Sequence, residues 1–197
     1  MKRQNKAEQK IAPSILESDS DYWFNACLNY APDQLALYIS GYRGAAEILL
    51  EHVLSARVAE LDTLVFPIIF LYRHYIELRL KSLIKCGSTL LELSLEIPYT
   101  HNISVLWKSC KDVFIKIWPD DIESIEETER EVMVFSELDP NSESFRYAQD
   151  KGGHPTLPGF KYINLTEVQK KMSKITPLLE GADTGISHYL DLRSSML

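Results

Sequence analysis

The sequence predicts an all-α protein, an up-and-down bundle of about five helices with a short Gly/Pro-rich loop or hairpin before the last helix. Apolar residues recur in steps of three and four along five segments, as they do on one face of a helix. Glycine or proline falls near the end of most of these segments. The 197 residues are 45% hydrophobic and 25% charged, which is the usual balance of one globular domain.

The predicted domain organisation is a charged N-terminal leader at residues 1–20 followed by a single helical domain at 21–197. No apolar segment follows the basic first ten residues, so they do not resemble a secretory signal. The longest apolar run, 64–72, contains Pro67 and is far shorter than the ~20 residues that span a bilayer. The three cysteines form no CxxC pair, which is typical of reduced thiols. We therefore expect a cytoplasmic protein with no membrane association.

The first helix is expected after Pro32, and the second from about residues 62–63 to Gly87. Small residues at 41 and 44–46 make the middle of the first helix slim, which would let a neighbouring helix come close. Pro67 is tolerable in the second helix because it lies near the first turn, where a missing N–H costs little. Gly87 is a reasonable residue to end that helix.

The third helix is expected after residues 100–102 and should end at Trp118-Pro119. The fourth runs from about 120 to 138, ended by Asp139-Pro140. The last helix opens at Asn164 with a glutamate three positions on, which is the spacing of a capping box. Its apolar stripe continues past Pro177, so we expect a kink or break there.

Two charged residues fall on the apolar face of the second helix. Arg73 and Glu77 are four positions apart, so they can pair along the helix. A guanidinium on such a face is costly unless its hydrogen bonds are satisfied. Two interpretations stay open: a structural ion pair that joins helices, or a cleft or interface where Arg73 meets an anion. His74 and Lys81 share an edge beside this face.

The segment 144–163, SFRYAQDKGGHPTLPGFKYI, holds two aromatic–basic–aromatic triplets at 145–147 and 160–162. The triplets can pair as a short hairpin, with Phe145 and Tyr147 on one face and Arg146 on the other. Alternatively, the segment is an aromatic lid packed on the bundle. In the functional interpretation, Arg146 is held by its flanking rings and binds a phosphate or carboxylate, which its planar guanidinium suits.

The histidines do not form a recognisable metal site. The five of them show no i,i+4 pair and no HExxH motif, so no metal and no cofactor are expected. The chain also lacks a Walker loop, a dinucleotide fingerprint and a nucleophile elbow. His101 stands where the third helix begins, where it either satisfies backbone groups or takes part in a site.

The negative charge is concentrated in one segment. The net charge is −7, and residues 120–143 hold ten acidic side chains against one arginine, leaving 18 acidic and 20 basic residues elsewhere. A protein that coats nucleic acid by charge alone is therefore disfavoured. A local basic pocket on the near-neutral remainder is compatible with this distribution. The acidic helix 120–138 is either a solvated surface or a docking face.

Residues 73–87, RHYIELRLKSLIKCG, and 99–107, YTHNISVLW, resemble the second and third helices of HEPN domains. FRYAQDKGG before INLTEVQKKM resembles the loop that those domains place before their last helix. The resemblance covers roughly residues 33–190 and rests on loose helical signatures. It implies a helical bundle that often dimerises, with members that cleave RNA as toxins or defence effectors, bind nucleotides, or assist a partner protein.

Cleaving members of that family carry Arg, four to six residues, then His. Here seven residues separate Arg146 from His154, and Arg73 and His74 are adjacent, so this chain departs from the pattern. Metal-independent RNA cleavage uses the RNA 2′-OH as nucleophile, a histidine to move protons and an arginine to stabilise the phosphorane. The candidate catalytic residues are Arg73, His74, His101 and Arg146, and the candidate substrate-binding residues are Glu77, Lys81, Tyr147, His154 and Lys161.

The sequence hypothesis is thus a HEPN-like homodimer that acts on RNA or a nucleotide, as a metal-independent ribonuclease in a bacterial defence or toxin–antitoxin system. The alternative is a non-catalytic helical module that binds a partner protein on the acidic helix 120–138. An arginine and a histidine exposed in one cleft would favour the enzyme. An Arg73 that is closed to solvent and paired with Glu77 would favour the alternative.

Overall fold

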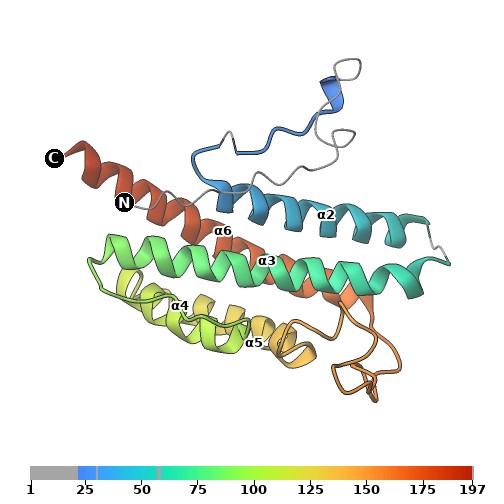
Figure 1. Cartoon of the computed structure of the whole chain (residues 1–197). Coiled ribbons are helices and arrows are strands. Elements are labelled where there is room, and N and C mark those ends of the chain that lie inside the picture. The colour runs from blue at the N-terminus through green and yellow to red at the C-terminus, as the bar shows by residue number, and fades with distance from the viewer. Residues whose placement is uncertain (1–21, 30, 57–58, 197) are drawn as a thin grey trace, which may run out of the picture. The chain divides into compact units, whose positions relative to one another are not determined.

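The computed structural model describes residues 22–29, 31–56 and 59–196, and this part of the chain contains five α-helices (Figure 1). The chain divides into two compact units, residues 1–34 and 35–197. In the first unit the described residues include the short 3-10 helix η1 (Tyr22–Phe24) and several exposed apolar side chains, namely Trp23, Phe24 and Leu28. The predicted leader, residues 1–20, lies outside the described residues.

The five helices are α2 (Gln34–Ala56), α3 (Leu61–Leu90), α4 (Ile103–Ile117), α5 (Ile122–Leu138) and α6 (Leu165–Ser195). The all-α prediction is confirmed, and each predicted helix is present within a few residues of its expected bounds. Among the described residues no strand forms, and one isolated antiparallel bridge joins Gln149 to Pro155. None of the helices in the described ranges is both long and apolar enough to cross a membrane.

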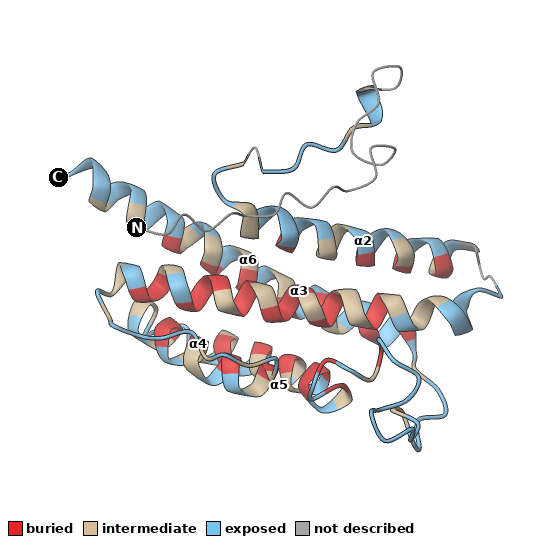
Figure 2. Ribbon diagram, viewed as in Figure 1, coloured by how far each residue is buried: buried red, intermediate tan, exposed pale blue. Residues whose placement is uncertain are grey.

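Helix α3 is the central element of the second unit. It packs against α4 and α6, and α5 in turn packs against α4 and α6. Figure 2 shows buried residues along most of α3. Helix α2 adds four buried side chains, Ile39, Ala46, Leu50 and Val53. Because neighbours enclose α3 on several sides, a polar residue on this helix must find its partners inside the protein.

Gly87 does not end α3, contrary to the prediction, because the helix continues to Leu90. A Cβ atom at Gly87 would overlap the Val113 side chain of α4 and would also contact Ile186 of α6. The glycine therefore permits three helices to approach one another closely at this point.

Two other expectations about the helices need correction. Helix α6 runs through Pro177 without the break that was one of the two expected outcomes. In α2, no atom lies within 4 Å of a Cβ built on Gly41 or Gly44, so among the described residues no neighbour approaches these two glycines closely, whereas Ala46 of the same small-residue stretch is buried in the core. The predicted cap of α6 is present, since the Asn164 side chain accepts hydrogen bonds from the backbone N–H groups of residues 166 and 167.

Candidate functional site: an aromatic loop above a buried ion network

Arg73 is the centre of a buried hydrogen-bond network. Its side chain is 0% exposed, and that of Glu77 is 1% exposed. Arg73 Nη1 donates to Glu77 Oε2 at 3.1 Å, and Nη2 donates to the His101 backbone oxygen at 2.6 Å. Nε donates to the Asp139 backbone oxygen at 2.7 Å. The guanidinium is therefore satisfied within the chain and closed to solvent, the arrangement expected of a structural ion pair.

Glu77 connects this network to the protein surface. Its Oε1 accepts hydrogen bonds from Lys81 Nζ at 2.7 Å and from His101 Nδ1 at 2.9 Å. Burial raises the pKa of the Glu77 carboxyl, but the hydrogen bonds and charges of Lys81 and His101 outweigh it, so the pKa lies below its ordinary value. The side chain of His101 is 66% exposed. Glu77 thus stays ionised while it ties α3 to the start of α4.

Asp139 holds the base of the loop that follows α5. Its Oδ1 accepts from the backbone N–H groups of Glu143 at 2.9 Å and Ser144 at 3.1 Å. Its Oδ2 is buried with no hydrogen-bond partner and lies 3.9 Å from Arg73 Nε. Arg73 also reaches the Pro140 backbone oxygen at 3.5 Å. The buried arginine therefore fixes the point from which the aromatic loop departs.

The first aromatic triplet forms a turn on this base. The N–H groups of Arg146 and Tyr147 both donate to the Glu143 backbone oxygen, at 3.1 and 3.0 Å. The Arg146 guanidinium carbon lies 5.6 Å from the centre of the Phe70 ring and 5.4 Å from that of Tyr147, which is cation–π range. Arg146 is thus held between two rings as expected, but Phe70 of α3 supplies one of them.

The predicted hairpin does not form, and residues 144–163 are a loop before the last helix. Phe145 turns inward, is 5% exposed and faces Phe66 of α3, whereas Tyr147 is 56% exposed. These two rings therefore do not share a face. Beyond the single bridge at 149 and 155, the described residues of the loop form no ladder. His154 stands near this bridge, 78% exposed, beside the Asp150 carboxylate.

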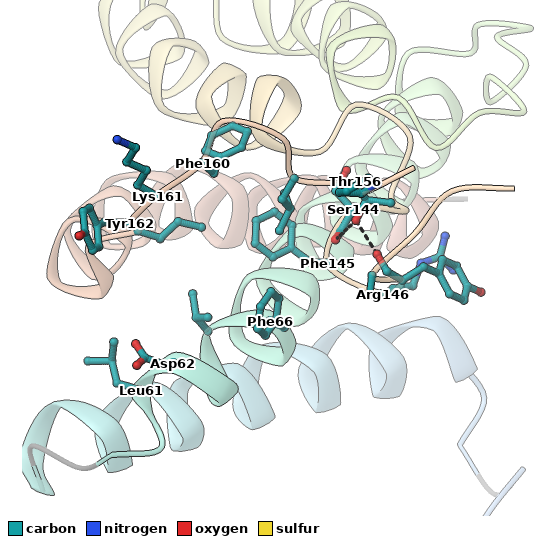
Figure 3. Close-up of a pocket in the computed structure, with 16 residues that line it drawn as sticks. Leu61, Asp62, Phe66, Ser144, Phe145, Arg146, Thr156, Phe160, Lys161 and Tyr162 are labelled. Atoms are coloured by element: carbon teal, nitrogen blue, oxygen red, sulfur yellow. Dashed lines mark hydrogen bonds between the residues drawn. The ribbon is translucent and has the colours of Figure 1, made fainter. Parts of the chain in front are cut away.

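A cavity of about 750 Å³ lies between the loop and the first turns of α3 (Figure 3). Five of the residues that line it are aromatic: Phe66, Phe145, Tyr147, Phe160 and Tyr162. Its charged lining residues are Arg146, Lys161 and Asp62. Figure 3 shows Arg146 and Lys161 at opposite ends, with Phe145 and Phe66 between them. The cavity therefore combines ring surfaces with a cation at each end.

His74 of α3 contacts the same Phe70 ring as the loop arginine and also contacts a ring of α2. Its ring stacks on Phe70 with centres 5.6 Å apart and meets Tyr42 edge-on at 4.4 Å. Burial lowers the pKa of His74, and the nearby cations Arg73, Lys81 and Arg146 lower it further against the opposing effect of Glu77. The imidazole is therefore neutral at pH 7, and no described residue hydrogen-bonds its ring.

The structure sorts most of the candidate residues into two groups. Hydrogen bonds join Arg73, Glu77, Lys81 and His101 into the buried network. Arg146, Tyr147 and Lys161 line the cavity. His74 contacts Phe70 beside them, and His154 belongs to neither group. Sequence reasoning missed Phe70 and Asp139 as members of the site, because the first was assigned to the apolar face and the second to a helix end.

Sequence reasoning also missed a second ionic cluster, between α3 and α6. Glu180 accepts from the Tyr75 hydroxyl at 2.6 Å and from two nitrogens of Arg79 at 2.9–3.2 Å. Arg79 is 6% exposed and also pairs with Asp183 at 2.7 Å. The sequence analysis considered only the face of this helix that carries Arg73 and Glu77. Arg79 was missed because it lies on a different side of α3, which is buried against α6.

Some acidic side chains of helix α5 form ion pairs with lysines of neighbouring helices. Glu131 pairs with Lys171 at 2.8 Å and Lys174 at 3.0 Å of α6, and Glu129 pairs with Lys111 of α4 at 2.6 Å. These contacts hold α5 on the bundle, so the free acidic surface is smaller than the sequence suggested. Among the described residues, no group of three His, Cys, Asp or Glu side chains is placed to hold a metal ion.

Comparison of the chain with protein-family models, with curated proteins and with solved structures finds no match.

Proposed function

We propose that this protein binds RNA, or a nucleotide, in the cavity between the aromatic loop and α3. The observation that carries the proposal is the pairing of exposed rings with a cation at each end of one cavity. Bases stack on aromatic side chains in a sequence-tolerant way, and basic side chains bind the phosphates between them. Phe66, Tyr147, Phe160 and Tyr162 are all 44% or more exposed, so their rings are available for stacking.

In this proposal Arg146 and Lys161 contact phosphate, and Arg73 does not. Arg73 is enclosed by its own chain and all of its described partners are protein groups. Its role is to position the loop base through Asp139. An Arg73 that is closed to solvent and paired with Glu77 is the arrangement expected of the non-catalytic alternative, so it counts against a catalytic role for Arg73.

Cleavage is a second candidate, supported by the His74–Phe70–Arg146 arrangement. A neutral His74 can take the proton from the RNA 2′-OH, whose oxygen then attacks the adjacent phosphorus. Arg146 can stabilise the charge on the phosphorane. The 5′-oxygen leaves with a proton from solvent or a second acid, giving a 2′,3′-cyclic phosphate and a 5′-OH. A defence or toxin–antitoxin role is the setting that the HEPN resemblance implies for such an activity.

A homodimer remains part of the proposal, on a different surface from the one expected. From the sequence we expected the dimer to form through helices that include the Arg73 face, because polar residues lie there on a stripe too apolar for solvent. The start of α4 and the 139–140 backbone cover that face within one chain. Light scattering coupled to gel filtration tests the dimer, and a strictly monomeric mass at tens of micromolar would remove it.

Binding is tested by fluorescence anisotropy with a labelled single-stranded RNA. We expect weak binding that falls with salt, with a slope of about −1.4 for two phosphate contacts to a single strand. Arg146→Ala and Lys161→Ala should each weaken binding and reduce the slope by about 0.7. Lys108→Ala, an exposed lysine on α4, is the control and should bind as the parent does. RNA binding that is unchanged in the Arg146/Lys161 double variant would overturn the proposal and favour a partner-binding role for α5.

Cleavage is tested separately on denaturing gels, with and without EDTA. The second candidate requires products that persist in EDTA, carry a 2′,3′-cyclic phosphate and are absent when the RNA is replaced by DNA, which has no 2′-OH. His74→Gln and Arg146→Ala should abolish cleavage. Activity that survives His74→Gln, or that is lost with the chelator, would eliminate the mechanism while leaving the binding proposal intact.

A further inference from the structure

A second cavity, of about 710 Å³, lies between α2 and α6 and has no part in the proposed RNA site. Its carboxylates are Glu47 and Glu51 of α2 and Glu180 of α6, and its cation is Arg43. Leu50, Met172 and Pro177 form apolar parts of the wall. We call this cavity the α2–α6 groove. Its volume is within the range of about 300–1,000 Å³ that is usual for small-molecule sites.

A hydroxyl that opens into this groove has no protein partner among the described residues. Tyr72 of α3 is 3% exposed and lines the cavity, and its hydroxyl has no hydrogen-bond partner among the described residues. Burial raises the pKa of Tyr72 to about 12, with Glu47 adding to the shift and Arg43 opposing it. The hydroxyl thus stays protonated, and the charges of Glu47 and Arg43 both act on it. The ring is packed in the protein while the hydroxyl is open to the groove, so its oxygen can accept a hydrogen bond from a polar ligand there.

The groove has more acidic than basic side chains in its lining, so part of its negative charge is not neutralised within the protein. Arg43 pairs with Glu47 Oε1 at 2.9 Å and with Glu180 at 3.4 Å. Glu180 is further neutralised by Arg79 of α3, which lines an adjoining hollow of about 240 Å³. Glu51 forms no ion pair among the described residues, and Glu47 shares Arg43 with Glu180. The unpaired negative charge is therefore on α2, within one turn of helix.

The spacing of these carboxylates favours an elongated cation over a metal ion. No three carboxylates in the described residues come close enough to hold a metal. Separate charges along an apolar wall match a chain of methylene groups with ammonium groups at intervals, since methylenes pack on apolar side chains while ammonium groups donate to oxygen.

We propose that the α2–α6 groove binds a linear polyamine, with ammonium groups on Glu47 and Glu51 and a hydrogen bond from one of them to the Tyr72 hydroxyl. The methylene segments lie on Leu50 and Met172. This site is independent of the RNA proposal, because it shares no lining residue with the loop cavity.

The test is isothermal titration of the full chain with spermidine, and with butylamine as a single-charge comparison. We expect spermidine to bind at one site per chain and butylamine at least tenfold more weakly, because it lacks the second charged hydrogen-bonding group. Glu51→Gln, at an exposed position, should weaken spermidine binding about tenfold. Tyr72→Phe, which removes one oxygen atom, should weaken it several-fold with an unchanged circular dichroism spectrum.

The control separates the groove from general attraction of a polycation to an acidic protein. Glu137→Gln removes the same charge from an exposed position on α5 and should leave the spermidine affinity unchanged. Equal weakening by Glu137→Gln and Glu51→Gln would overturn the proposal, as would the absence of saturable spermidine binding. Full spermidine affinity in both Glu51→Gln and Tyr72→Phe would also overturn it. None of these outcomes bears on the RNA site, since anisotropy with RNA measures that site separately.

Discussion

Arg73 contacts both the backbone and the side chain of Asp139. Its Nε donates a hydrogen bond to the Asp139 backbone oxygen at 2.7 Å and lies 3.9 Å from the carboxylate Oδ2. Both side chains are 1% exposed or less. The other carboxylate oxygen of Asp139 binds the two N–H groups at the start of the aromatic loop. The enclosed helix α3 is therefore connected through one aspartate to the segment that carries Arg146.

This connection predicts different effects for two substitutions at position 139. Asp139→Asn keeps an oxygen acceptor for the two N–H groups and removes the charge, whereas Asp139→Ala removes both. We expect Asp139→Ala to cost about 2–3 kcal/mol of unfolding free energy and Asp139→Asn about 1 kcal/mol. Urea titrations measure both. Equal losses would mean that the charge beside Arg73, and not the loop contact, is what stabilises the fold.

The same connection predicts that the RNA affinity falls in Asp139→Ala even where the variant is fully folded. The loop base would lose its two N–H contacts and present Arg146 less uniformly. Anisotropy at low temperature should show weaker binding in Asp139→Ala than in Asp139→Asn. Parent-like binding in both would indicate that the backbone oxygens of Ser142 and Glu143, which accept hydrogen bonds from Arg146, and the Phe70 ring hold Arg146 without help from Asp139.

Glu77→Ala should destabilise the protein far more than Arg146→Ala does. Glu77 is 1% exposed, and its removal would leave Arg73 without its buried counterion, at a cost of about 3–5 kcal/mol. Arg146 lies on an exposed loop, so its loss should cost about 1 kcal/mol or less. Thermal melts of both variants decide the matter. Shifts of equal size would show that water reaches the Arg73–Glu77 pair.

Most of the fold was predictable from the sequence because the helices of this chain have regular apolar stripes. Asn164 was recognised as a helix cap from its spacing to Glu167, and the structure confirms it. Gly87 was misassigned because a glycine near a helix end has two explanations, a cap or a close contact, and only the position of Val113 separates them. Periodicity locates a helix but does not say which neighbour crosses it.

The site was only partly predictable, since its members come together from distant segments. Arg73 and Glu77 were identified as a pair from their spacing, and Arg146 from its flanking rings. The ring that actually faces Arg146 besides Tyr147 is Phe70, which is 76 positions earlier in the chain. The sequence around Asp139 indicated only the end of a helix, and nothing in it predicted a contact with Arg73. Such contacts depend on how α3 passes beneath the loop, which no local pattern records.

The lowered pKa of His74 predicts a loss of stability in mild acid. Burial is its main cause, so the folded protein binds a proton at His74 only below the ordinary value of 6.5. Above pH 6.5 the ring is neutral in both states. As the pH falls below 6.5 the unfolded chain is protonated first, so the unfolding free energy decreases until the pH reaches the folded pKa.

Urea titrations between pH 7.5 and about pH 5 measure this dependence. His74→Phe should make the unfolding free energy less sensitive to pH in that window. His188→Phe, at an exposed position on α6, controls for the loss of a histidine and should retain the parent's dependence. A parent-like pH profile in His74→Phe would show that the ring is not desolvated in the folded state.

Gly87 and Gly181 should respond to alanine in opposite directions. Both lie inside long helices, where alanine is intrinsically favoured over glycine by about 1 kcal/mol. A Cβ at Gly181 meets no atom within 4 Å, so Gly181→Ala should stabilise by about 0.5–1 kcal/mol. A Cβ at Gly87 overlaps the Val113 side chain, so Gly87→Ala should destabilise by about 1–3 kcal/mol.

A double variant tests whether this overlap is the cause. Adding Val113→Ala removes the overlapping methyl groups, so the double variant should lose less unfolding free energy than the sum of the two single losses. Additive losses in urea titrations would mean that α4 moves away from Gly87→Ala without strain, and that the close crossing of α3 and α4 is not required by the packing of this bundle.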